Sequence, residues 1–185
     1  MMVVRFCDDG GIEFNVGPPV MLAIAGALWL VTGNPSWSVF TFSADAVFIG
    51  IAFGTACAVG TQLVAMHLPP RVVAEMNAAA DAGEEHWFAD ASAGVLAALT
   101  EELVFRGLQM TVTPFVGVVP AIIIVGVAFG LVHRIRNLWV TMLIALGGIA
   151  IGVAFVLTGS IITAIVCHAT YNLIACYLAR DGVES

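Results

Sequence analysis

The chain has 185 residues, of which 61% are hydrophobic and only 10% are charged. A soluble domain carries about 25% charged residues, so this composition excludes an ordinary soluble protein and indicates an integral membrane protein. The formal net charge is −7 and no basic stripe runs along the sequence, so we expect no nucleic-acid partner.

Apolar runs of near-membrane length recur along the chain, which predicts helices rather than a barrel. In chain order the predicted spans cover residues 16–32, 44–68, 89–110, 116–132, 138–157 and 161–179. The first run is short and opens with Pro18-Pro19, so a short or tilted helix and a re-entrant segment both remain open.

Residues 71–90 mix acidic and basic side chains with apolar ones, which predicts an amphipathic helix at the membrane interface and then a loop around Gly83. We therefore expect an all-α membrane protein with about six transmembrane helices plus a short amphipathic interfacial helix. Residues 1–185 would form a single polytopic membrane domain, since no repeat and no separate soluble domain is evident.

The arginines predict the orientation of these spans. With six spans, one side of the membrane would carry Arg5, Arg71, Arg134, Arg136 and Arg180, and the loops on the opposite side hold no Lys or Arg. The positive-inside rule then places both termini in the cytoplasm of a multi-pass protein of the cell membrane. If residues 16–32 fail to span, only the N-terminus changes sides.

Three ionisable residues lie in the middle of the third apolar run, where each costs on the order of 3 kcal/mol. Glu102 and Arg106 are four residues apart and share one helix face, so they can pair. Glu101 lies about 100° round the helix from Glu102, so the arginine neutralises it less easily. We expect Glu102 and Arg106 to be structural and Glu101 to be available for chemistry.

Polar residues of two later runs fall at a compatible depth. Glu101 lies eleven residues after Asp90, and His168 twelve residues before Arg180, which places both roughly 16–18 Å from the cytoplasmic side. Asn172 is one turn from His168 on the same face, and both can donate hydrogen bonds to an oxyanion.

His133 ends the fourth run, one turn after Phe129, nearer the cytoplasm. Four polar side chains from three helices would thus line one cavity that opens to the cytoplasm. A structural explanation remains open for each of them. A buried histidine or asparagine can act as interhelical glue, and the Glu-Glu-Arg cluster can be a purely structural ion-pair network.

Together these residues carry a resemblance. Glu101-Glu102-x-x-x-Arg106, Phe129-x-x-x-His133 and His168-x-x-x-Asn172 occur in that order on separate predicted helices. The ordered set resembles the CAAX prenyl endopeptidase type II and bacteriocin-processing (CPBP, or ABI) family of intramembrane proteases. The resemblance covers a motif-bearing core, residues 87–178.

The resemblance implies a role for each motif residue. Glu101 matches the glutamate that acts as general base on a water molecule, and His133 matches the histidine that helps to hold and polarise that water. His168 and Asn172 match the residues proposed to stabilise the oxyanion of the tetrahedral intermediate. Glu102 and Arg106 match the remaining motif positions, and Phe129 is expected to support the site.

A metal ion is the alternative to a metal-free glutamate mechanism. Glu101, His133 and His168 can in principle supply three zinc ligands, but the chain lacks the helical His-Glu-x-x-His pattern of zinc proteases. We follow the metal-free mechanism that the resemblance implies and expect neither a metal nor another cofactor.

The sequence therefore predicts an intramembrane endopeptidase that hydrolyses a peptide bond of a membrane-proximal peptide or protein through a glutamate-activated water. Its partners would be that substrate and the lipid bilayer, and the oligomeric state stays open. Two other classes also stay open. One is a proton or metal-ion transporter that uses intramembrane Glu and His residues, and the other is a catalytically inactive scaffold of the same family.

Overall fold

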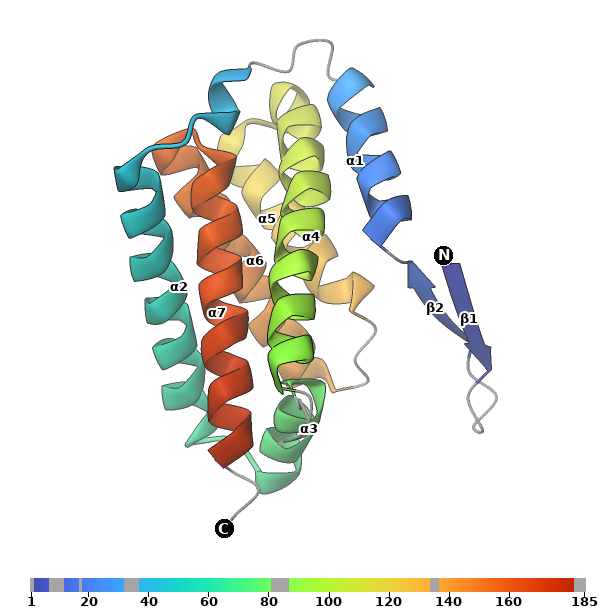
Figure 1. Cartoon of the computed structure of the whole chain (residues 1–185), viewed down its shortest axis with the longest axis vertical. Coiled ribbons are helices and arrows are strands. Elements are labelled where there is room, and N and C mark those ends of the chain that lie inside the picture. Colours follow the sequence, from blue (N-terminus) through green and yellow to red (C-terminus); the bar gives the residue numbers. More distant parts are fainter. Residues whose placement is uncertain are drawn as a thin grey trace.

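A computed structural model of the chain describes residues 2–6, 12–16, 18–31, 37–80, 87–133 and 137–181. Within these residues the chain forms seven α-helices arranged as a bundle (Figure 1). They are α1 (Pro18–Val31), α2 (Ala44–Ala65), α3 (Pro70–Ala80), α4 (Trp87–Val116), α5 (Val118–Val132), α6 (Leu138–Thr158) and α7 (Ile161–Asp181). A single 3-10 turn, η1 (Trp37–Phe40), precedes α2.

The helical prediction is confirmed in its main elements, although some boundaries differ. Each predicted apolar run is a helix, and α3 occupies the position of the predicted interfacial helix. α4 is longer than the predicted run and continues past Pro114, which stands in its last turn. α5 then begins after Gly117, whose φ of 86° is accessible to glycine at little cost.

The chain also contains a β-hairpin, so the all-α prediction was incomplete. β1 (Met2–Phe6) pairs in antiparallel register with β2 (Ile12–Val16). Both strands are rich in β-branched and aromatic residues, which fit a pleated backbone, and the sequence between them contains Asp9-Gly10, a frequent hairpin signal.

Helix length and composition support part of the predicted span count. Among the described residues, three helices are long and apolar enough to cross a membrane, namely α2, α6 and residues 161–178 of α7. α1 and α5 are apolar but shorter, and at 1.5 Å per residue each covers only about 21–23 Å of a hydrocarbon core of roughly 30 Å. Six spans therefore remain a prediction.

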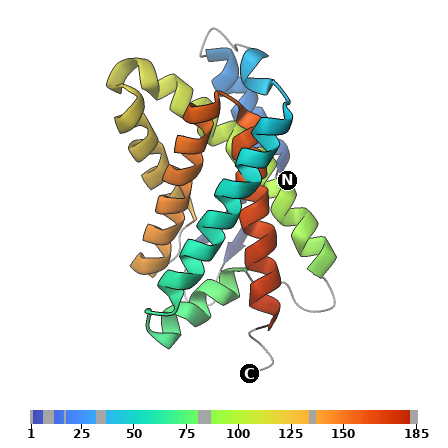
Figure 2. The ribbon, with the colours of Figure 1, turned by 90° about the vertical axis from the view of Figure 1, so that its left-hand side faces the viewer.

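Small residues allow α2 and α7 to pack closely. Ala46, Gly50, Gly54 and Ala58 recur every four residues on α2, and all four are buried. A Cβ atom on Gly50 would lie 2.8 Å from the Cβ of Val166 on α7, so a larger side chain does not fit there. As a result, α7 lies between α2 and α4 (Figures 1 and 2), and both neighbours contact it.

The bundle has an apolar exterior and a partly polar interior, as expected for a membrane protein. Large apolar side chains such as Phe48, Leu131 and Leu157 are more than half exposed on its surface. In contrast, the charged pair Glu102 and Arg106 has no exposed surface. Exposed apolar surface on this scale indicates contact with lipid. Buried polar groups inside a membrane bundle are candidates for a functional site.

Candidate active site

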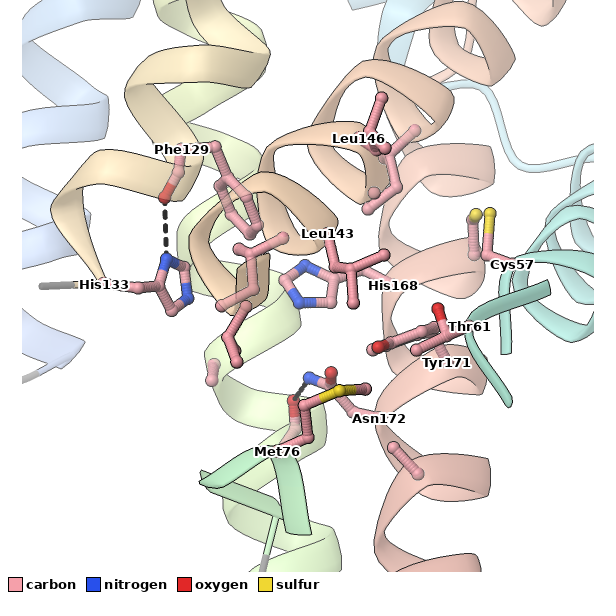
Figure 3. A pocket seen from close by; sticks show the side chains of 18 of the residues that line it. Cys57, Thr61, Met76, Phe129, His133, Leu143, Leu146, His168, Tyr171 and Asn172 are labelled. Carbon is pink, nitrogen blue, oxygen red and sulfur yellow. Dashed lines mark hydrogen bonds between the residues drawn. The ribbon is translucent and has the colours of Figure 1, made fainter. Parts of the chain in front are cut away.

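A cavity of about 680 Å³ lies between α2, α4, α5, α6 and α7, and α3 adds Met76 to its wall (Figure 3). All four residues predicted to act directly on a substrate line this cavity, namely Glu101, His133, His168 and Asn172. Phe129 also lines it. The structure thus brings together residues of three helices, and the two that are farthest apart in the sequence, Glu101 and Asn172, are separated by 71 positions.

Beneath the cavity wall, Glu102 and Arg106 form the predicted ion pair. Arg106 Nε donates to Glu102 Oε2 at 2.8 Å, and neither side chain is exposed. Their i, i+4 spacing on α4 places both on one helix face, so the pair forms without distortion of the helix. A buried carboxylate without this partner would be strongly unfavourable.

The second oxygen of Glu102 contacts α7. His168 Nδ1 lies 2.8 Å from Glu102 Oε1, and the carboxylate beside Arg106 accepts this hydrogen bond, so Nδ1 carries the proton. The contact fixes the orientation of the His168 ring and leaves Nε2 as the ring nitrogen that can serve a ligand in the cavity. Sequence reasoning missed this contact, because nothing in the spacing of two residues 66 positions apart predicts it.

His133 stands at the C-terminal end of α5, opposite Glu101. Its Nδ1 donates to the carbonyl oxygen of Phe129 at 2.7 Å, and its Nε2 lies 4.0 Å from Glu101 Oε2. Both side chains are partly exposed to the cavity, 31% for His133 and 23% for Glu101. The separation exceeds a direct hydrogen bond, so the two groups face one another across a space that a small bridging molecule can occupy.

Phe129 separates the two histidines and contacts both. Its ring centroid lies 4.7 Å from that of His133 and 5.5 Å from that of His168. On its other side it packs edge-on against Phe105 at 4.8 Å. The buried Phe129 ring therefore limits the positions that both imidazoles can take.

Asn172 lines the cavity one turn below His168 (Figure 3), but part of its amide is already engaged. Its Nδ2 donates to the carbonyl oxygen of Gly94 at 3.1 Å, which joins α7 to α4. One N–H is therefore used within the protein. The second N–H and Oδ1 are the atoms with which Asn172 can reach a ligand.

Polar residues of two further kinds, one behind the cavity wall and one in it, were missed from the sequence. Gln109 is 1% exposed and accepts a hydrogen bond from Arg106; the signal that could have found it is a polar side chain in the apolar part of α4, three residues after Arg106. The cavity wall also holds Thr61 of α2 and Tyr171 of α7 (Figure 3). Single polar residues in apolar runs gave no pattern that distinguished them from ordinary core positions.

The same geometry limits the atoms that could bind a metal ion. Within the described part of the chain, no three His, Cys, Asp or Glu side chains are grouped as metal ligands. In particular, His168 Nδ1 is bound to Glu102 and His133 Nδ1 to a backbone carbonyl, so only their Nε2 atoms remain for other partners.

Comparison with known proteins gives one family match. A family model described as type II CAAX prenyl endopeptidase Rce1-like matches residues 84–174, a segment that contains every residue of the three motifs. No curated protein and no solved structure shows significant similarity to the chain. The segment 84–174 therefore carries the Rce1-like domain of type II CAAX prenyl endopeptidases.

Proposed function

We propose that this protein hydrolyses a peptide bond inside the membrane region with a water molecule activated by Glu101. One observation carries the proposal. The carboxylate of Glu101 and Nε2 of His133 face one another at 4.0 Å on the wall of a cavity that His168 also lines. The family match supports a protease activity of this type.

The tautomer of His133 supports a defined position for the water. Because Nδ1 donates to the Phe129 carbonyl, Nε2 of the neutral ring is an acceptor. A water between the two residues then donates one hydrogen to Glu101 and the other to His133, and its lone pair faces the substrate. A candidate general base needs this hydrogen-bond reach to the proton that it removes, directly or through one water.

Hydrolysis then proceeds in two steps. Glu101 takes a proton from the water as the oxygen attacks the peptide carbonyl carbon, which forms a tetrahedral oxyanion. His168 acts as the imidazolium, with a proton on each ring nitrogen, and donates to this oxyanion through Nε2–H while Nδ1–H stays bound to Glu102. The C–N bond breaks as Glu101 passes its proton to the leaving nitrogen, which restores the carboxylate. Asn172 assists the oxyanion with its remaining N–H.

The cavity supports a peptide as substrate. Its volume of about 680 Å³ lies within the range of roughly 300–1,000 Å³ found for ligand pockets, and most of its lining is apolar, so it suits an uncharged segment of a membrane-proximal chain. The family description makes a prenylated CAAX peptide the first substrate to test.

The direct test uses purified protein in detergent with an internally quenched peptide that ends in an S-farnesylated CAAX sequence, and with its unprenylated form. We expect the parent to cleave at least one of them and Glu101→Gln to lose about 100-fold or more of kcat, since a general base contributes roughly 10²–10⁴-fold. Thr111→Val is the matched control, because the Thr111 hydroxyl donates to the carbonyl of Gly107 on its own helix and Thr111 does not line the cavity. Equal cleavage by folded parent, Glu101→Gln and His133→Ala would refute the proposal.

We also propose that the cavity opens toward the cytoplasm. α3 carries Arg71 and lies at the end of the bundle where α2 and α7 finish and α4 begins (Figures 1 and 2). His133 ends α5 on the way to that side. Both chain termini would then be cytoplasmic, as the positive-inside rule predicts.

A further inference from the structure

Gln109 is a fully buried amide on α4 that neither touches the cavity nor belongs to the three motifs. Its Oε1 accepts a hydrogen bond from Arg106 Nη1 at 2.5 Å, and its Nε2 lies 3.5 Å from the carbonyl oxygen of Gly152 on α6. This amide orientation is the one that chemistry requires, because a guanidinium needs an acceptor and a carbonyl needs a donor. Gln109 therefore fixes one end of the Arg106 guanidinium against α6.

The position of that guanidinium also fixes the Glu102 carboxylate. Nε of Arg106 is bound to Glu102 Oε2, Nη2 lies 3.5 Å from the carbonyl oxygen of Gly148, and Nη1, at the far end of the group, is bound to Gln109. A planar guanidinium held at both ends cannot turn, so the carboxylate that it binds is held with Oε1 toward His168.

α6 leaves room for the Arg106–Gln109 hydrogen bond because position 152 is a glycine. A Cβ atom on Gly152 would lie 2.7 Å from Arg106 Nη1 and 3.1 Å from Gln109 Oε1. Even an alanine would therefore displace the hydrogen-bonded pair of Arg106 and Gln109. By contrast, a Cβ atom on Gly147, in the same helix, would meet nothing within 4 Å.

We propose that Gln109 is a positioning residue of the active site: by anchoring the far end of the Arg106 guanidinium, it holds the Glu102 carboxylate in the orientation that accepts the hydrogen bond of His168. Its effect on catalysis rests on the proposed peptidase function, whereas its effect on the His168–Glu102 hydrogen bond does not. Without Gln109, the Arg106 guanidinium is free to turn, the Glu102 carboxylate turns with it, and the hydrogen bond that orients the His168 ring is weakened or lost.

The hydrogen bond can be observed without any substrate. A proton held between imidazole Nδ1 and a buried carboxylate gives a strongly downfield proton resonance, which ¹⁵N-histidine labelling identifies among the four histidines of the chain. Its loss in His168→Asn assigns it. We expect it to disappear or shift strongly in Gln109→Met, which has nearly the same side-chain volume. Gln109→Glu keeps an acceptor for Nη1 and is expected to retain the signal.

Gly152→Ala provides a second and independent variant, since it disturbs the same pair without removing a polar group. It should change the resonance as Gln109→Met does, while Gly147→Ala should leave it at the wild-type position. An unchanged resonance in whichever of Gln109→Met and Gly152→Ala is folded overturns the inference.

Kinetics give the complementary readout on a substrate that the parent cleaves. Partners behind a reactive group are typically worth about tenfold or more, so Gln109→Met should lower kcat by about tenfold and leave KM unchanged. If Gln109 had a purely structural role, Gln109→Met would lower the amount of folded enzyme but would leave the kcat of the folded fraction unchanged. If Glu101→Gln is inactive while Gln109→Met has wild-type kcat, the inference fails and the proposed function stands. If the parent cleaves no peptide, the proposed function fails, and the resonance alone decides the role of Gln109.

Discussion

The Glu102 carboxylate links two helices in the interior of this protein. Glu102 has no exposed surface and uses one oxygen for Arg106 and the other for His168, so it joins α4 to α7 with charged hydrogen bonds. The pairing with Arg106 could be predicted from the sequence because both residues share one turn of one helix. The contact with His168 could not, because it depends on how two distant helices pack.

Loss of the Glu102 charge should therefore destabilise the whole fold. In Glu102→Gln, the amide leaves the buried Arg106 guanidinium without a counter-charge, and breaking a buried pair in this way costs about 3–5 kcal/mol. We expect a correspondingly lower free energy of unfolding, measured by denaturant titration in detergent micelles. Glu75→Gln on the exposed surface of α3 is the control and should change little. Similar losses in both variants would contradict a special role of the buried pair.

At the scale of elements, the helices were predictable and the contacts between them were only partly so. Apolar runs ended by Pro and Gly located α2, α5, α6 and α7 to within a few residues. The hairpin β1–β2 was missed, because two strands of five residues each carry a weaker signal than an apolar run of helical length. The small-residue stripe on α2 is visible in the sequence, but its partner helix is not.

The small-residue stripe on α2, formed by Ala46, Gly50, Gly54 and Ala58, provides a test of helix packing. A Cβ atom on Gly54 would overlap the backbone carbonyl of Cys167 on α7, and a backbone atom cannot move aside as a flexible side chain can. Gly54→Ala should therefore separate α2 from α7 and destabilise the protein by about 1–3 kcal/mol, the usual cost of overpacking. Gly60→Ala, on the same helix with nothing within 4 Å of the added Cβ, should be neutral or slightly stabilising. Equal thermal midpoints for the two variants would show that α2 does not pack as described.

At the scale of the whole molecule, the sequence indicates the membrane environment more clearly than the number of membrane crossings. The apolar exterior follows directly from the composition, because charged residues make up only 10% of the chain. The number of crossings does not follow, since α1 and α5 are shorter than a standard span and α4 carries charges in its middle. Which helices cross the bilayer completely depends on tilt and on local membrane thickness, and neither is encoded in a run of apolar residues.

Topology reporters at the two ends of the chain distinguish the remaining arrangements. With six crossings and arginines on the cytoplasmic side, a fluorescent protein that folds only in the cytoplasm should be bright at either terminus, and alkaline phosphatase, which folds only outside, should be inactive at both. If α1 does not cross, the C-terminal result stays the same and the N-terminal result reverses, because α1 is the first helix. A C-terminus outside the cytoplasm would place Arg71 of α3 and the His133 end of α5 on the outer side. The proposal of a cytoplasmic opening would then be wrong, although the contacts within the cavity would be unaffected.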